Sequence, residues 1–165
     1  MDLNKLFQQW IGAWRFHRKI HSQIKDAIDG TVIGSVSIKK IDETTLHYQE
    51  QGVLTTSLDA KLNMHREYVY KYCPIKNIIE KYFSINNKPS TLFYRLHFNS
   101  NQINTILTAH ADHQCNQDYY EADYSFFGFF DNNLFDNFSL IYQVTGPKKA
   151  YTSETRYERL SIPYF

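Results

Sequence analysis

The residues best suited to chemistry lie around His113-Gln114-Cys115, with His110 and Asp118 close by in the sequence. Imidazole and thiolate are zinc ligands, and a histidine beside a cysteine can activate the thiol as a nucleophile. A structural zinc site needs four ligands and usually paired cysteines, whereas this segment has one cysteine. We therefore expect no metal. We favour a ligand mouth over the alternative, a loop whose His and Asp side chains hydrogen-bond the backbone.

Arg66 is the second candidate, because a strand periodicity would place it among aromatic rings. It shares one strand face with Met64, Tyr68, Tyr70 and Tyr72. A guanidinium offers a fork of donors to a carboxylate or phosphate, and its burial without an anionic partner is costly. Two interpretations stay open: Arg66 anchors an anionic ligand inside the protein, or it pairs with Glu50 or an acidic neighbour.

Composition excludes several classes of protein. The formal net charge is +1, with 18 basic and 17 acidic residues interspersed, so we expect no nucleic-acid partner. No stretch approaches the roughly 20 apolar residues of a membrane helix, and the first residues lack the features of a secretion signal. We expect a cytoplasmic protein without a membrane span, in which Cys73 and Cys115 stay reduced.

Tyrosine is unusually frequent, with 13 Tyr and 12 Phe among 165 residues. A buried phenol needs a hydrogen-bond partner, so an interior rich in tyrosine is either a hydrogen-bonded network or a hydrated cavity.

The elements that position these residues follow from the hydrophobic period. Asp2 or Asn4 can cap a short helix, which Gly12 ends; its apolar face comprises Leu3, Leu6, Phe7, Trp10 and Ile11. From Trp14 onward the period is two, with Trp14, Phe16, Arg18 and Ile20 on one face of a first strand. Further strands follow at short spacing almost to the end of the chain.

Several interruptions of the strands are expected. Gly34 should mark a bend or bulge, residues 50–52 a break or kink, and residues 111–118 an irregular polar segment. Turns are expected over residues 86–89, 99–102 and 131–133 and at Gly146-Pro147. Either face of residues 91–98 could be buried.

No segment after Gly12 has the length and period of a substantial helix, so the strands must be antiparallel. Nine or ten short strands can form a sandwich or a barrel, and a barrel leaves no exposed edge. We predict an all-β fold: a single up-and-down antiparallel barrel over residues 1–165, with the short N-terminal helix covering one end.

Gly12-x-Trp14 after a short helix resembles the signature of the calycin barrels, which include lipocalins and fatty-acid-binding proteins. The resemblance implies that Gly12 and Trp14 are structural and that an arginine of the last strand packs across Trp14 at the closed end. Arg159, or failing that Arg156, would be that arginine.

Nearly the whole chain is similar to domain-of-unknown-function family 6314, which comprises small calycin-like domains without an established activity. The matching residues are Gly12 to Arg15 with Arg18 and Ile20, Tyr48 to Gly52, Arg66 with Tyr68, His113 to Cys115 with Asp118 and Tyr120, Val144 to Lys149 with Tyr151, and Tyr157 with Arg159. The family usually has arginine at Lys148 and an acid at Ala150, so this chain departs from it there. The resemblance implies a fold and candidate positions without a substrate.

We predict that the barrel binds a small, mostly apolar molecule that carries a polar or anionic group, without a cofactor. The predicted lining residues are Arg66, Tyr68, Tyr70, His97, His113, Asp118 and Tyr120, with His113 and Cys115 at the mouth. Two alternatives remain: a lyase or isomerase that acts on a small organic acid with His113 as general acid or base, and a barrel that binds haem through a histidine.

Overall fold

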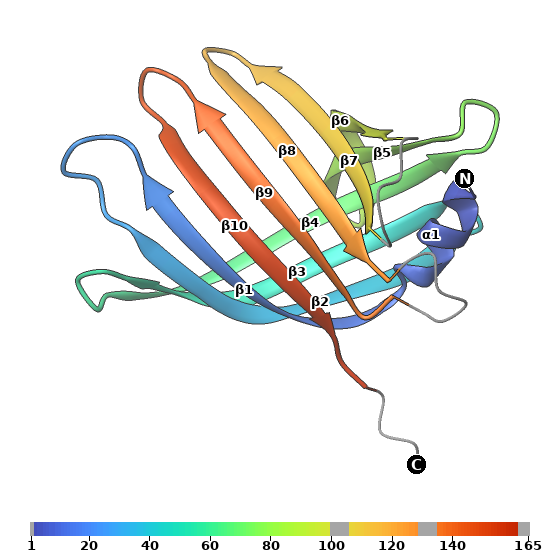
Figure 1. Cartoon of the computed structure of the whole chain (residues 1–165), viewed down its shortest axis with the longest axis horizontal. Coiled ribbons are helices and arrows are strands. Elements are labelled where there is room, and N and C mark those ends of the chain that lie inside the picture. Colours follow the sequence, from blue (N-terminus) through green and yellow to red (C-terminus); the bar gives the residue numbers. More distant parts are fainter. Residues whose placement is uncertain (1, 100–105, 129–134, 162–165) are drawn as a thin grey trace.

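The computed structural model describes residues 2–99, 106–128 and 135–161. Its elements are α1 (Leu3–Gln9), β1 (Gly12–Ser22), β2 (Gly30–Asp42), β3 (Thr45–Thr56), β4 (Lys61–Cys73), β5 (Ile78–Ile85), β6 (Lys88–Phe98), β7 (Ile106–Cys115), β8 (Asp118–Phe127), β9 (Asn137–Thr145) and β10 (Ala150–Arg159). The ten antiparallel strands close into a barrel in which β1 pairs with β10 (Figure 1). The predicted fold class is confirmed. The turns expected over 99–102 and 131–133 lie outside the described residues, apart from Asn99.

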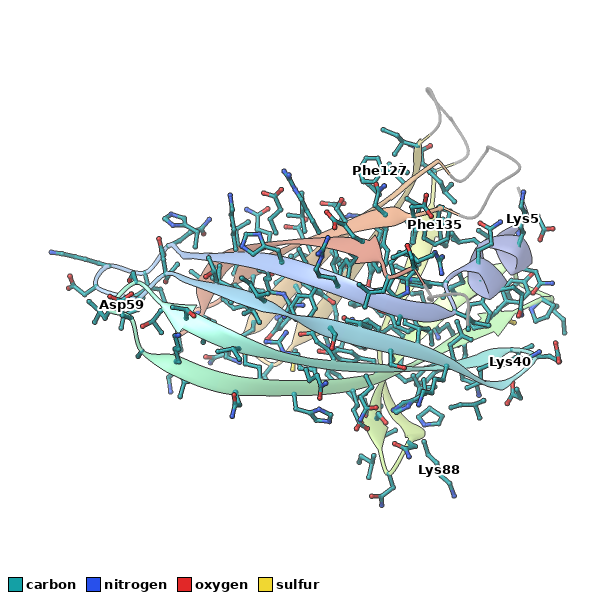
Figure 2. All side chains as sticks on the ribbon, turned by 90° about the horizontal axis from the view of Figure 1, so that it is seen from below. Lys5, Lys40, Asp59, Lys88, Phe127 and Phe135 are labelled. Carbon is teal, nitrogen blue, oxygen red and sulfur yellow. The ribbon has the colours of Figure 1, made fainter. Side chains whose placement is uncertain are left out.

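Helix α1 covers one end of the barrel. The Asp2 side chain caps it by accepting a hydrogen bond of 3.1 Å from the amide of Lys5. Its apolar face is buried in the core, where the ring of Trp10 lies 4.7 Å from that of Tyr70. Figure 2 shows Lys5 of α1 and Asp59 of the β3–β4 turn at opposite ends of the molecule. The end near Asp59 is therefore the one that the helix does not cover.

Trp14 and Arg159 lie together at the covered end. Cζ of Arg159 is 4.1 Å from the centre of the Trp14 ring, and the guanidinium donates hydrogen bonds to the carbonyls of Gln9, Ile11 and Phe135. Gly12 has a φ of 146°, and a Cβ there would lie 2.8 Å from Nη1 of Arg159. A glycine at this position lets the arginine reach the carbonyls that the helix and β1 leave open.

Two glycines make room for an aromatic ring in the wall. Gly34 of β2 is paired with Gly52 of β3, and a Cβ on Gly34 would lie 2.8 Å from the ring of Phe16. Neither a bulge at Gly34 nor a break over residues 50–52 occurs, because β2 and β3 pair without a shift from Gly30 to Lys40. The glycines permit close approach and do not interrupt the ladder.

The polar segment over 111–118 is also regular, so that expectation is wrong. β7 continues to Cys115 and β8 begins at Asp118, with a tight turn in which Asn116 adopts a φ of 54°. Polar residues alternate with inward ones along β7, so a strand is compatible with this composition. His113 and Cys115 consequently share the inward face, whereas His110 points outward.

The seam between β6 and β7 is the least closed part of the wall. Within the described residues, these strands are paired only at His97–His110 and Phe98–Ala109. The β5–β6 hairpin, marked by Lys88, projects away from the barrel (Figure 2). No helix in the described ranges is both long and apolar enough to cross a membrane.

Candidate binding cavity

A cavity of about 470 Å³ opens at the end of the barrel opposite α1. Its lining residues come from nine of the ten strands and from the β9–β10 turn. Most of the lining side chains are aromatic or aliphatic. The lining residues are Arg18, Ile20, Leu54, Met64, Arg66, Tyr68, Phe83, Phe93, Cys115, Tyr120, Tyr142, Lys149, Tyr151 and Ser153. A larger hollow of about 710 Å³ is lined by residues that flank 129–134, which the structure does not describe, and by outward polar side chains of β9 and β10. We therefore take the cavity inside the barrel as the candidate site.

Five of the predicted site residues come together here. Arg66, Tyr68, Cys115 and Tyr120 line the cavity. His113 is the strand partner of Tyr120, and its ring packs edge-on against Phe93 with 5.4 Å between the ring centres. It therefore lies beside the cavity wall.

The other three predicted residues lie elsewhere. Tyr70 is deeper, in the core, where its hydroxyl is 3.2 Å from that of Tyr124. Asp118 lies at the rim, with its carboxylate 3.8 Å from Nζ of Lys149 and packed against Gly146. His97 is exposed on the outer surface, because Leu96 takes the inward position of β6 at this level.

A buried ion pair that sequence reasoning did not identify lies below the cavity. The guanidinium of Arg18 donates two hydrogen bonds to the carboxylate of Glu50, of 2.8 and 2.9 Å, and a third to Thr155. Tyr48 donates to the same carboxylate at 2.6 Å. Burial alone raises the pKa of Glu50, but the hydrogen bonds and charge of Arg18, together with Tyr48, outweigh it and lower the pKa below its ordinary value of 4.5.

The Arg18–Glu50 pair leaves Glu50 unavailable as a hydrogen-bonded partner of Arg66. Arg66 is the strand partner of Glu50, the acid expected to neutralise it, but Glu50 is bound to Arg18. Within the described part of the chain, the guanidinium of Arg66 has neither a hydrogen bond nor an ion pair. None of the described residues that line the cavity is acidic. The cavity therefore presents a free guanidinium beside apolar walls.

Lys81 of β5 is the least expected residue near the cavity. It is only 2% exposed, and Nζ lies 2.9 Å from the hydroxyl of Tyr142, 3.2 Å from that of Tyr94 and 3.8 Å from the centre of the Tyr68 ring. Burial lowers its pKa well below 10.5; the charge of Glu50 opposes this, and those of Arg66 and Arg18 add to it. Lys81 lies two residues after the buried Ile79, so the alternation of β5 could have predicted that its side chain faces inward.

The tyrosines around Lys81 form a chain of hydroxyls. Tyr142 is hydrogen-bonded to Tyr94, Tyr94 to Tyr124 at 2.6 Å, and Tyr124 to Tyr70 at 3.2 Å. Burial raises the pKa of each of these phenols, so they remain protonated near neutral pH. The interior thus contains both a tyrosine network and a cavity.

The histidines and cysteines do not converge on one point. His110 faces outward and lies 2.8 Å from Asp123, on the opposite side of β7 from His113 and Cys115. Among the residues with a described position, no three His, Cys, Asp or Glu side chains are grouped as metal ligands would be.

Solved structures of the same fold cover almost the whole chain. The S-type phycobiliprotein lyase CPES from Guillardia theta aligns over 98% of this chain and 94% of its own, at 11% identity and a TM-score of 0.66. Rv2717c from M. tuberculosis aligns over 98% of this chain and 99% of its own, at 9% identity and a TM-score of 0.55. Identities this low show the fold alone.

Comparison of the sequence with known proteins gives the family. No curated protein matches the chain. A family model described as a family of unknown function, DUF6314, matches residues 10–159, which extend from Trp10 at the end of the helix to Arg159 at the end of β10. The chain therefore belongs to this family of unknown function.

Proposed function

We propose that the barrel binds a small, mostly apolar molecule whose carboxylate, or a similar anionic group, pairs with Arg66. The observation that carries this proposal is the guanidinium of Arg66, which has no ion pair within the described part of the chain and lies in the wall of an aromatic cavity whose described lining includes no acid. A carboxylate matches the donor fork of a guanidinium and would supply the missing negative charge.

The dimensions and chemistry of the cavity support one ligand of this kind. A volume of about 470 Å³ falls in the range of sites for single small molecules. Leu54, Met64, Phe83 and Phe93 offer apolar contacts, each worth about 25 cal/mol per Å² of surface buried. Lys149 adds a second positive charge at the mouth.

The two alternatives receive less support. A lyase or isomerase would need His113 in contact with a substrate, yet its ring packs against Phe93 and does not line the cavity. Haem ligation would need a histidine in the wall, and none of the described lining residues is a histidine.

The proposal is tested with two ligands that differ in one group, biphenyl-4-carboxylic acid and biphenyl-4-methanol. We expect Arg66→Gln to weaken binding of the acid about tenfold or more, as expected for loss of a charged hydrogen-bonded pair, and to leave binding of the alcohol unchanged. Arg156→Gln is the matched control, because Arg156 is 78% exposed on the outer face. Equal affinity of the wild type and Arg66→Gln for the acid, measured by calorimetry, would refute the anchor.

A further inference from the structure

Lys81 is an unusual buried lysine because no carboxylate among the described residues forms an ion pair with it. Lysine side chains normally keep the ammonium in water while the stem packs. Among the residues that the structure describes, the hydrogen-bond partners of Nζ are the hydroxyls of Tyr94 and Tyr142, and no carboxylate lies within ion-pairing distance. The surroundings therefore favour an uncharged amine.

The hydrogen bond between the neighbouring tyrosines does not depend on this amine. Tyr94 and Tyr142 are hydrogen-bonded to each other without it, and an unbranched apolar side chain of similar length would fill the same space. An amine buried at such a place is more consistent with reactivity than with packing.

The amine lies directly behind the cavity wall. Tyr68, Phe93 and Tyr142 all line the cavity, and Nζ lies 3.8, 5.5 and 5.6 Å from the centres of their rings. Phe93 belongs to β6, at the seam where β6 and β7 are paired least. These aromatic side chains lie between the amine and the cavity, so a reaction of Lys81 with a bound ligand requires one of the rings to move.

We propose that Lys81 forms an imine with the carbonyl group of an apolar aldehyde or ketone bound in the cavity. The nitrogen lone pair attacks the carbonyl carbon, and the resulting carbinolamine loses water to give the C=N bond. The carbonyl oxygen leaves with the two hydrogens of the amine, so no oxidant or reductant is required. This inference rests on the proposed function, since the cavity must first hold the ligand.

Two features of the site assist this reaction. An uncharged amine is the nucleophilic form, and burial favours that form by lowering the pKa of Lys81 well below 10.5. The hydroxyl of Tyr142, 2.9 Å from Nζ, is placed to donate a proton to the departing hydroxyl and to take one back from nitrogen.

The test uses the full chain, biphenyl-4-carboxaldehyde and sodium cyanoborohydride, which reduces an imine to a stable amine. Intact mass and peptide mapping should give one adduct, on Lys81, that is lost in Lys81→Met. Lys88→Met is the matched control, because Lys88 is exposed in the projecting hairpin, and it should keep the adduct. The rate should rise less steeply with pH than the adduct rate of an exposed lysine, because burial lowers the pKa of Lys81.

The outcomes separate this inference from the proposed function. Adducts confined to exposed lysines, such as Lys149 at the mouth, would overturn the imine. If biphenyl-4-methanol still binds in that case, the cavity remains a binding site; if it does not bind, the proposed function also fails. Mapping in the wild type decides the question even where Lys81→Met does not fold, and excess biphenyl-4-carboxylic acid should slow an adduct that forms through the cavity.

Discussion

Arg18 and Glu50 are joined by two parallel hydrogen bonds inside the barrel, and both side chains are at most 5% exposed. This ion pair affects the charge balance at two other basic side chains, Arg66 and Lys81. It occupies the acid that faces Arg66 across the β3–β4 ladder, and so leaves Arg66 without a hydrogen-bonded or ion-paired partner among the described residues. It also places the negative charge of Glu50 with Arg18, and Lys81 forms no ion pair with any residue in the described ranges.

Breaking this pair should strongly destabilise the fold. Glu50→Gln leaves the buried charge of Arg18 uncompensated, and we expect a loss of about 3–5 kcal/mol in the free energy of unfolding. Glu154→Gln is the matched control, since it removes an exposed pair with Arg156 and should change stability by about 1 kcal/mol or less. Urea denaturation measures both. Equal effects of the two substitutions would show that the buried pair is not a stabilising contact.

The same pair predicts acid sensitivity. The pKa of Glu50 is lower in the folded protein than its unfolded value of 4.5, so its contribution to stability is fully present above that pH. The contribution is lost as the pH falls through the folded pKa. The wild type should therefore lose more stability than Glu50→Gln as the pH drops below about 4.5. Thermal melts across that range would contradict this if the two proteins lost stability in parallel.

Lys81 predicts a dependence on pH of the same sign, in the range below its unfolded pKa of 10.5. Its pKa is lowered in the folded state, so between the folded pKa and 10.5 the unfolded chain binds one more proton. Stability of the wild type should then rise with pH by about 1.4 kcal/mol per unit relative to Lys81→Met, up to the unfolded value. The tyrosines titrate in both proteins, so their effect cancels in the difference. A difference that is flat with pH would mean that Lys81 is charged in the fold.

The period of the sequence predicted the barrel and the inward face of β1, including Arg18, because alternation is a local property. It could not predict that Glu50 pairs with Arg18 and not with Arg66, since that choice depends on how long side chains from different strands meet inside the barrel. The sequence also could not predict which residues of β6 face the interior. A register shift between Lys81 and Tyr82, opposite Phe93, lets both Phe93 and Tyr94 face inward, which simple alternation forbids.

Gly34 gives a test of the close packing in the wall. A Cβ at this position would lie 2.1 Å from the carbonyl oxygen of Gln51 and 2.6 Å from Cα of Gly52, both backbone atoms. We expect Gly34→Ala to destabilise the fold by about 1–3 kcal/mol or more, because the ladder must shift. At Gly30, in the same strand, the nearest atom at 2.7 Å is the end of the Leu54 side chain, which can move. A Gly30→Ala variant that loses as much stability as Gly34→Ala would contradict this explanation.

Arg159 predicts that stability and binding are controlled from opposite ends of the barrel. Arg159→Met keeps the stem over Trp14 but removes the donors to the carbonyls of Gln9, Ile11 and Phe135. Each buried acceptor left without a donor costs about 1–3 kcal/mol, so the midpoint of urea denaturation should fall clearly. The affinity of the folded variant for biphenyl-4-carboxylic acid should stay unchanged, because the cavity lies at the far end. A weakened affinity at unchanged stability would reverse these assignments and place the ligand beside α1.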